Sequence, residues 1–195
     1  RVDTSAQSAR RASELAARLM TSGQKRSGRP APVDLRSAAE HAMGIIKQSF
    51  ANNLTVERQF SDFPVPVNIR IEDLENAIIN VALNARDAMP TGGKLTVKID
   101  TVEHSGPVRG IKETIPPGKY GALFFSDTGS GINPKDLESV VEPFFTTKES
   151  ENGTGLGLSM IHEFMRESDG YMRIHSKLGA GTTVELYFPL SQPTD

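Results

Sequence analysis

The side chains of residues 72–89 divide into two stripes of different chemistry, and this pattern constrains the fold more than any other segment of the chain. At about 100° per residue, an apolar stripe runs beside a polar one. The apolar stripe comprises Leu74, Ile78, Val81, Ala85 and Ala88, and the polar stripe comprises Asn76, Asn80, Asn84 and Asp87. The pattern predicts a helix from Glu72 to Met89 that ends before Pro90, because proline cannot continue the helical hydrogen bonding.

The aligned asparagines of this helix need a separate explanation, because asparagine is a poor helix former. A solvated polar face is one interpretation, although such faces usually carry Lys, Glu and Arg. Amide oxygens on one face can instead ligate a hard cation. Mg²⁺ takes only one or two protein oxygens when phosphates and waters complete its octahedron. Spacing alone leaves both alternatives open.

The remaining hydrophobic patterns predict helices and strands in mixed order. Helices are expected at 34–49, with Asp34 as N-cap, at 155–167, and briefly at 135–140. The apolar face of the first would comprise Leu35, Ala38, Ala42, Ile45 and Ile46. Strands are expected at 55–60, 67–71, 94–102, 120–126, 171–176 and 182–188. This order favours an α+β two-layer sandwich, a mixed sheet packed on helices, over a doubly wound parallel fold.

The composition excludes several kinds of site. The 195 residues include no cysteine, which excludes a thiolate zinc site, a cysteine nucleophile and a disulfide scaffold. The basic first 36 residues contain no aromatic side chain for base stacking, so a nucleic-acid partner is not expected. No apolar run approaches the roughly 18 residues of a membrane span.

An acid and two glycines follow the most apolar of the predicted strands, at Asp127, Gly129 and Gly131. An ionised carboxylate only accepts hydrogen bonds, which suits it to an exocyclic amine such as that of adenine. The glycines permit backbone conformations and close approaches that other residues would block. An ordinary turn is the alternative for this motif.

Alternating glycines at 153, 155 and 157 lead into the predicted helix at 155–167. The N–H groups and dipole at a helix N-terminus favour anions such as phosphate. The spacing matches neither G-x-G-x-x-G nor a Walker A motif, which argues against a Rossmann or P-loop protein. The preceding residues, 129–153, are rich in Gly, Pro and polar side chains and predict a mobile cover. In it, Phe144 and Phe145 are expected to dock, and Lys148 to reach a terminal phosphate.

Five motifs together resemble the N, G1, F, G2 and G3 boxes of sensor histidine kinases. In order, they read LENAIINVALNARDAMP, SDTGSGI, EPFFTTK, GTGLGLSM and GAGTTVELYF. The resemblance covers residues 32–189 and is to the ATP-binding catalytic domain, which belongs to the GHKL superfamily of gyrase and heat-shock chaperones. The N and F boxes are most similar to those of nitrogen-regulation and hybrid kinases. The resemblance implies the Bergerat ATPase fold with an ATP lid at about 129–153.

The resemblance also implies roles for individual residues. Asn84 would bind Mg²⁺ with help from Asn80, and Asn84 and Lys148 would act in catalysis. Asp127 would receive the adenine amino group, with Thr183 supporting that contact, while Asp87 stands where many relatives have a lysine. The complete set of implied nucleotide contacts is Asn80, Asn84, Asp87, Asp127, Gly129, Gly131, Lys148, Gly153, Thr154, Gly155, Leu156, Gly157, Leu158 and Thr183.

The family further implies a division of the chain into parts. Residues 1–24 resemble the C-terminal part of the second helix of a dimerisation hairpin, with an apolar stripe at Val2, Ala9, Ala12, Ala16 and Leu19. Residues 25–33 would be a linker, 34–190 the catalytic domain and 191–195 a tail. None of the four histidines fits the phospho-accepting position, so this fragment is expected to be an incomplete kinase.

The implied activity is transfer of the γ-phosphoryl group of ATP to a histidine of the dimerisation helix, for relay to an aspartate of a response regulator. The expected partners are therefore the dimerisation helices of a homodimer and a receiver domain. A cytoplasmic location without direct membrane contact is expected for this part, whether or not the intact protein is anchored. Two alternatives remain from the sequence: a nucleotide-binding regulatory module without transfer, and another GHKL-type mechanical ATPase.

Overall fold

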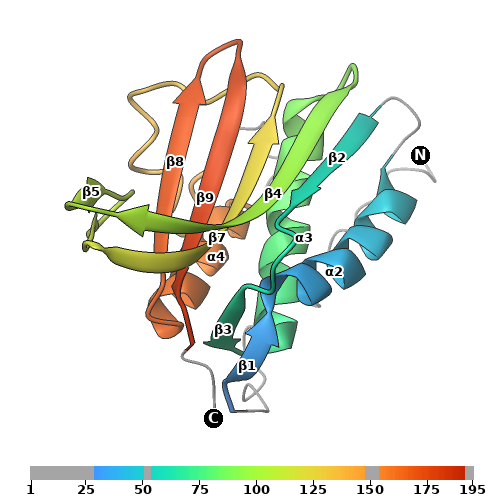
Figure 1. Cartoon of the computed structure of the whole chain (residues 1–195). Helices are drawn as coiled ribbons and strands as arrows, with labels where there is room; N and C mark the ends of the chain where they lie inside the picture. Colours follow the sequence, from blue (N-terminus) through green and yellow to red (C-terminus); the bar gives the residue numbers. More distant parts are fainter. Residues whose placement is uncertain (1–28, 51–53, 148–153, 192–195) are drawn as a thin grey trace.

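The computed structural model describes residues 29–50, 54–147 and 154–191, except for the side chains of 47–49 (Figure 1). The predicted dimerisation helix at 1–24 therefore lies outside the described residues, as do Lys148, Gly153 and most of the predicted tail.

Five strands form one mixed sheet in the order β2-β4-β7-β9-β8 (Figure 1). They are β2 (Leu54–Phe60), β4 (Gly93–His104), β7 (Gly118–Asp127), β8 (Tyr171–Lys177) and β9 (Gly181–Pro189). Strand β2 pairs with β4 in parallel, and the other three pairs are antiparallel. The mixed pairing confirms the α+β prediction and excludes the doubly wound parallel alternative.

In the described part of the chain, three helices pack against this sheet: α2 (Leu35–Ser49), α3 (Ile71–Ala88) and α4 (Gly157–Glu167). Helix α3 contacts both α2 and α4, and it also contacts β7 and β9. The main core lies between the helices and the inward side chains of the sheet, such as Leu95, Leu123 and Phe188. Inward and outward residues alternate along each strand, so Tyr120 and Tyr187 form a second apolar cluster with Ile115 on the opposite face.

Three of the four short strands in the described residues were not predicted from the sequence, whereas the fourth, Pro66–Ile69, corresponds to the strand predicted at 67–71. Strand β1 (Ala31–Asp34) pairs antiparallel with β3 (Pro66–Ile69) and occupies part of the expected linker. Strands β5 (Val108–Arg109) and β6 (Thr114–Ile115) form a hairpin between β4 and β7. Two-residue strands are too short for alternation to be visible in a sequence.

Three predicted details were wrong. Ile45 is 44% exposed, because the buried face of α2 passes through Ala39 and Met43 instead. Residues 135–140 form successive turns. Most of their backbone hydrogen bonds join residues three apart rather than the four of an α-helix, so no continuous helix forms there. Helix α4 begins at Gly157 rather than 155, because Gly155 has a left-handed φ of 63° that an α-helix cannot accommodate.

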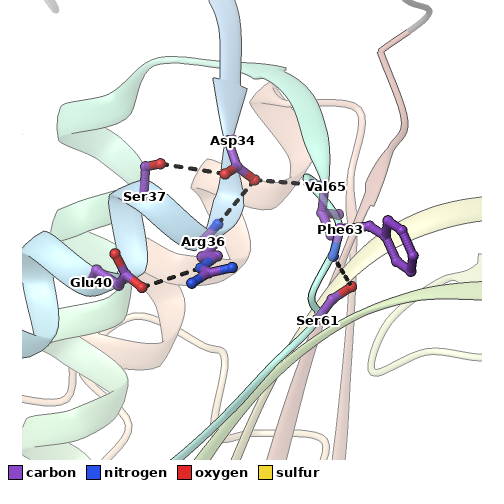
Figure 2. Close-up of polar contacts among 7 residues, drawn as sticks. All are labelled: Asp34, Arg36, Ser37, Glu40, Ser61, Phe63 and Val65. Atoms are coloured by element: carbon purple, nitrogen blue, oxygen red, sulfur yellow. Dashed lines mark hydrogen bonds and ion pairs between the residues drawn. The ribbon is translucent and has the colours of Figure 1, made fainter.

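The predicted N-cap at Asp34 is confirmed and has a second role (Figure 2). Its Oδ1 accepts the N–H of Arg36 at 3.3 Å, which caps α2, and also the N–H of Val65 at 2.9 Å. The N–H of Leu35 donates in turn to the Val65 carbonyl at 3.1 Å. Val65 is fully buried, so one carboxylate both starts α2 and satisfies a buried amide at the entry to β3.

Replacing Asp34 with Ala should therefore lower the free energy of unfolding by about 2–3 kcal/mol, since it removes a helix cap and leaves a buried N–H unsatisfied. Asp34→Asn keeps an acceptor oxygen and is expected to lose less than half of that. Urea unfolding measures both variants, with Asp62→Ala as an exposed control in the neighbouring loop. Equal stability of the Ala and Asn variants would contradict the double role.

Candidate nucleotide-binding site

The carboxylate of Asp127, at the end of β7, is held in one orientation by two backbone N–H groups. Its Oδ1 accepts from Gly129 at 2.8 Å and from Thr182 at 3.2 Å. Within the described residues, Oδ2 accepts no hydrogen bond, so it remains available to a ligand donor. Burial raises the pKa of the Asp127 carboxyl, and the two N–H groups oppose that rise. The side chain is thus a partly buried acceptor with fixed geometry.

The backbone after Asp127 passes very close to the last turn of α3. A Cβ atom on Gly129 would lie 2.7 Å from the carbonyl oxygen of Ala88 and 2.7 Å from its Cβ. The N–H of Ser130 donates to the same carbonyl at 3.0 Å. Only glycine allows this approach, so the Asp-x-Gly motif joins the strand end to the helix.

Two further glycines bring the hairpin between β8 and β9 against this strand end. Gly181 has φ 102°, and a Cβ there would overlap the carbonyl of Asp127. Gly131 has φ 70°, and a Cβ there would overlap the carbonyl of Lys177. Both positions need a left-handed backbone and free space at once, which only glycine provides. The G1 and G3 motifs therefore form one structural unit.

Thr183, which the family resemblance predicts to support the adenine contact, lies beside this unit. It pairs with Ser126 across β7 and β9, and the two hydroxyl oxygens are 2.9 Å apart. Thr128 joins the same region to the start of β4, because its Oγ1 accepts the N–H of Lys94 at 3.0 Å. Neither Thr128 nor the N–H of Thr182 was predicted from the sequence. The Thr182 donor belongs to the backbone, and the Thr128 hydroxyl pairs with a backbone N–H, so neither pairing leaves a pattern of side chains.

Asn84 lies against the first residue of α4. A Cβ on Gly157 would be 3.1 Å from Asn84 Nδ2 and 3.4 Å from Oδ1. Asn80 and Asn84 are half-buried, whereas Asn76 is exposed. Asp87 is exposed, and its Oδ1 accepts from Arg86 Nη2 at 2.9 Å. The predicted polar stripe therefore divides: its two middle residues are half-buried, with Asn84 against α4, and its ends are exposed.

The N-terminus of α4 keeps the backbone donors that the glycine motif predicted. No side chain caps it within the described part of the chain, and its first turn contains no acidic residue. Thr154, Gly155, Leu156 and Leu158 are all half-buried around this end. Free N–H groups at the start of an 11-residue helix suit an anion.

Phe144 and Phe145 were both predicted to dock the segment before α4, but Val141 is the residue that anchors it, and Phe145 is half-buried. Phe144 is 73% exposed, whereas Val141 is 5% exposed and belongs to the main core. The expectation that Phe144 docks the cover is therefore wrong. The N–H of Phe144 donates to the carbonyl of Gly155 at 2.9 Å, which ties the cover to the start of α4.

Helix α3 brings the two parts of the candidate site together. Asn84 meets Gly157 of α4, and Ala88, one turn further on, meets Gly129 after β7. The sequence assigned Ala88 to the core only. Its small side chain opposite a glycine could have indicated a backbone approach. Lys148 and Gly153, also predicted here, lie outside the described residues.

Comparison with known proteins decides the family. Residues 69–192 match the model of the histidine kinase-, DNA gyrase B-, and HSP90-like ATPase family. The chain belongs to this family. Its domain is the ATP-binding catalytic domain of a sensor histidine kinase, as the five motifs predicted, and the mechanical-ATPase alternative is not favoured.

Curated relatives support the same assignment. Sensor kinase CckA of Brucella abortus is 31% identical over 94% of this chain, and histidine protein kinase DivJ of Caulobacter vibrioides is 31% identical over 80%. The chain spans only 19% and 24% of those two relatives. It is thus similar to one part of much longer kinases.

Solved structures show the same fold. The mycobacterial sensor histidine kinase MprB has a TM-score of 0.66 at 22% identity, covering 83% of this chain and 97% of its own. The catalytic domain of histidine kinase ThkA has a TM-score of 0.67 at 18% identity, covering 84% of this chain and 97% of its own. At sequence identities this low, the structural similarity shows only that the fold is shared.

Gly129→Ala should lower the free energy of unfolding of this kinase domain by about 1–3 kcal/mol, because the added Cβ would displace the backbone of Ala88. Gly44→Ala is the matched control: it lies in α2, and its added Cβ would have no atom within 4 Å, so it should gain about 1 kcal/mol from helix propensity. Chemical denaturation of both variants checks the sign. If Gly129→Ala left the free energy of unfolding unchanged, α3 and the end of β7 could move apart without loss of stability, which would contradict this interpretation.

Proposed function

We propose that this domain binds Mg-ATP between the end of β7 and the start of α4, and transfers the γ-phosphoryl group to a histidine of a dimerisation helix. The observation that carries the proposal is the meeting of Asn84 with Gly157 and of Ala88 with Gly129 on one side of α3. The proposed adenine acceptor, Asp127, and the proposed anion-binding N-terminus of α4 thereby lie beside consecutive turns of the same helix, α3.

Asp127 would recognise the adenine. Its Oδ1 is occupied by two N–H groups, which leaves Oδ2 to accept from the exocyclic amine. Guanine carries a carbonyl oxygen at the corresponding position and would repel a carboxylate. Thr183, on the adjacent strand, would support the contact. The orientation of Asp127 thus favours ATP over GTP.

The start of α4 would hold the phosphates. Its uncapped N–H groups and the backbone around Thr154, Gly155 and Leu156 supply donors without side-chain bulk. Gly157 keeps the helix close to Asn84, because a larger residue would push against that amide. The protein would mainly position the phosphates and neutralise their charge, which is how most of the barrier to phosphoryl transfer is lowered.

Asn84, helped by Asn80, would hold the magnesium ion. The described residues contain no cluster of three His, Cys, Asp or Glu, so the donors fit an ion bound by amide oxygen, phosphates and water rather than an all-protein cage. When bound, Mg²⁺ would neutralise charge on the phosphates.

We place Lys148 at the γ-phosphate and Gly153 in the phosphate loop by motif position alone. For Asp87, its exposure and its contact with Arg86 favour a role outside the direct phosphate contacts.

The phosphate acceptor would come from another segment. A neutral imidazole nitrogen forms the N–P bond as the bond from phosphorus to the β-phosphate oxygen breaks, and ADP leaves. The four histidines of the chain have other surroundings. His41, His162 and His175 each lie beside a glutamate, and His104 packs on Tyr187. A homodimer would present the acceptor helix, and a receiver domain would take the phosphate afterwards.

In the described residues, no helix has the length and apolarity needed to cross a membrane.

Asp127→Asn should weaken ATP binding by about tenfold or more, because the amide presents a donor to the adenine amine, and should weaken GTP far less. A carboxyl with a raised folded-state pKa holds its proton more tightly in the native protein. Its contribution to stability is therefore lost as pH rises from the ordinary value through the folded pKa.

The Asn variant does not titrate and should be at least as stable as the unmodified chain at pH 7. Calorimetric titration with each nucleotide and urea unfolding between pH 4 and 8 give the two readouts. Parallel losses of ATP and GTP affinity would contradict the adenine assignment.

Incubation with γ-labelled ATP, Mg²⁺ and a separately made dimerisation domain should label that domain on histidine. Asn84→Ala should reduce labelling by about 100-fold, as expected for loss of a metal-positioning group. Asn76→Ala is the control, because it removes an exposed asparagine from the same stripe of the same helix. Absence of label with the unmodified chain would refute the transfer activity.

A further inference from the structure

We propose that the β5–β6 hairpin (residues 108–115) is a support that holds the first half of the ATP lid in its binding position, with Arg109 and Lys112 as positioning residues. This inference rests on the proposed function, because it names what controls the position of the lid in that site. The lid segment concerned is residues 132–145.

The hairpin is attached to the domain at its base, through Ile115, and at its tip, through Ile111. Ile115 is fully buried in the outer cluster, and Tyr120 Oη donates to the carbonyl of Pro116 at 2.9 Å. Ile111 is 8% exposed and belongs to the main core on the helix side, and its N–H donates to Met172 of the edge strand β8 at 2.9 Å. The hairpin therefore wraps around the β8 edge of the sheet (Figure 1).

Close backbone packing keeps the hairpin rigid at this edge. A Cβ on Gly110 would lie 2.7 Å from the carbonyl oxygen of Glu113 and 3.0 Å from that of Met172. The N–H of Gly110 donates to the Glu113 carbonyl at 2.8 Å. The side chain of Glu113 reaches His162 of α4 at 3.4 Å. The tip is thus fixed against both the sheet and the helix.

Two cations on this hairpin face two acids on the lid. Arg109 Nη2 lies 2.7 Å from Glu138 Oε1, and Lys112 Nζ lies 3.3 Å from Glu142 Oε1. The acids are four residues apart, and Val141 between them is buried in the main core. The two ion pairs and the apolar anchor attach one short stretch of the lid to one support.

This stretch is connected directly to the candidate phosphate site. Two residues beyond Glu142, the N–H of Phe144 donates to the carbonyl of Gly155, and Gly157 follows against Asn84. Phe144 has a left-handed φ of 67°, a costly conformation for a residue with a side chain, so this contact depends on a well-defined lid position. A lid released from the hairpin would disturb the hydrogen bond to Gly155.

The test uses the full chain and breaks the ion pairs from either side. Arg109→Glu with Lys112→Glu, and separately Glu138→Lys with Glu142→Lys, should each weaken Mg-ATP binding by about fivefold, the sum expected of two surface ion pairs. Because the two double variants change the net charge in opposite directions, a shared effect identifies the pairing rather than the overall charge. Combining all four substitutions should restore the affinity.

Hydrogen exchange of the lid amides gives a readout that does not depend on nucleotide. Residues 136–145 should exchange faster in both double variants, while α3 and the thermal midpoint stay unchanged. Arg58→Glu with Lys119→Glu is the control, since it reverses two exposed cations on strands away from the lid.

Unchanged lid exchange, or no rescue in the combined variant, would overturn the proposal. A chain that binds no ATP would instead contradict the proposed function, and lid exchange would still decide whether the hairpin holds the lid.

Discussion

The close approach of three backbone segments at the end of β7 is the constraint on which the rest of the domain depends. The chain after Asp127 meets the last turn of α3 through Gly129 and the start of β9 through Gly181, with no side chain between them. Because the contacts are between main chains, they set the distance from the sheet to its central helix. The orientation of Asp127 follows, since the N–H groups that hold its carboxylate belong to these same segments.

Helix α3 fixes the relative positions of the two parts of the candidate site. Its apolar face packs on the sheet through side chains such as Leu74, Ile78 and Val81, which are all buried. That packing sets the rotation of the helix, and the rotation turns Asn84 toward the N-terminus of α4. A rigid helix then spaces Asn84 and Ala88 by one turn. Asp127, the proposed adenine acceptor, and the N-terminus of α4, the proposed phosphate site, keep a fixed separation as a result.

The site contains a conflict between stability and function. Burial raises the pKa of Asp127, so its ionised form is held at a cost that the two backbone N–H groups only partly offset. Phe144 likewise adopts an unfavourable backbone conformation beside Gly155. Both are held by backbone hydrogen bonds, Asp127 by the N–H groups of Gly129 and Thr182 and Phe144 by its own N–H to the carbonyl of Gly155. The hairpin that wraps the β8 edge extends this support to the lid.

Hydrophobic periodicity predicted the long elements well, because burial of one face leaves a visible pattern in α3, β4 and β9. It failed for β1, β5 and β6, whose short lengths show no period, and for Ile45, where one residue of rotation exposed a side chain that the pattern placed inside. The glycine motifs predicted close approaches but could not name their partners, since a backbone carbonyl such as that of Ala88 has no sequence signature.

The sequence by itself determined the family, the mixed α+β class and most of the residues proposed for the site, because motif order and side-chain chemistry are properties of the chain alone. The tertiary structure decided which of these residues meet. Only folding brings Gly157 to Asn84, Thr182 to Asp127, and Glu138 to Arg109, because each pair joins segments that are distant in the chain and are set side by side by the packing of α3 and the pairing of the sheet.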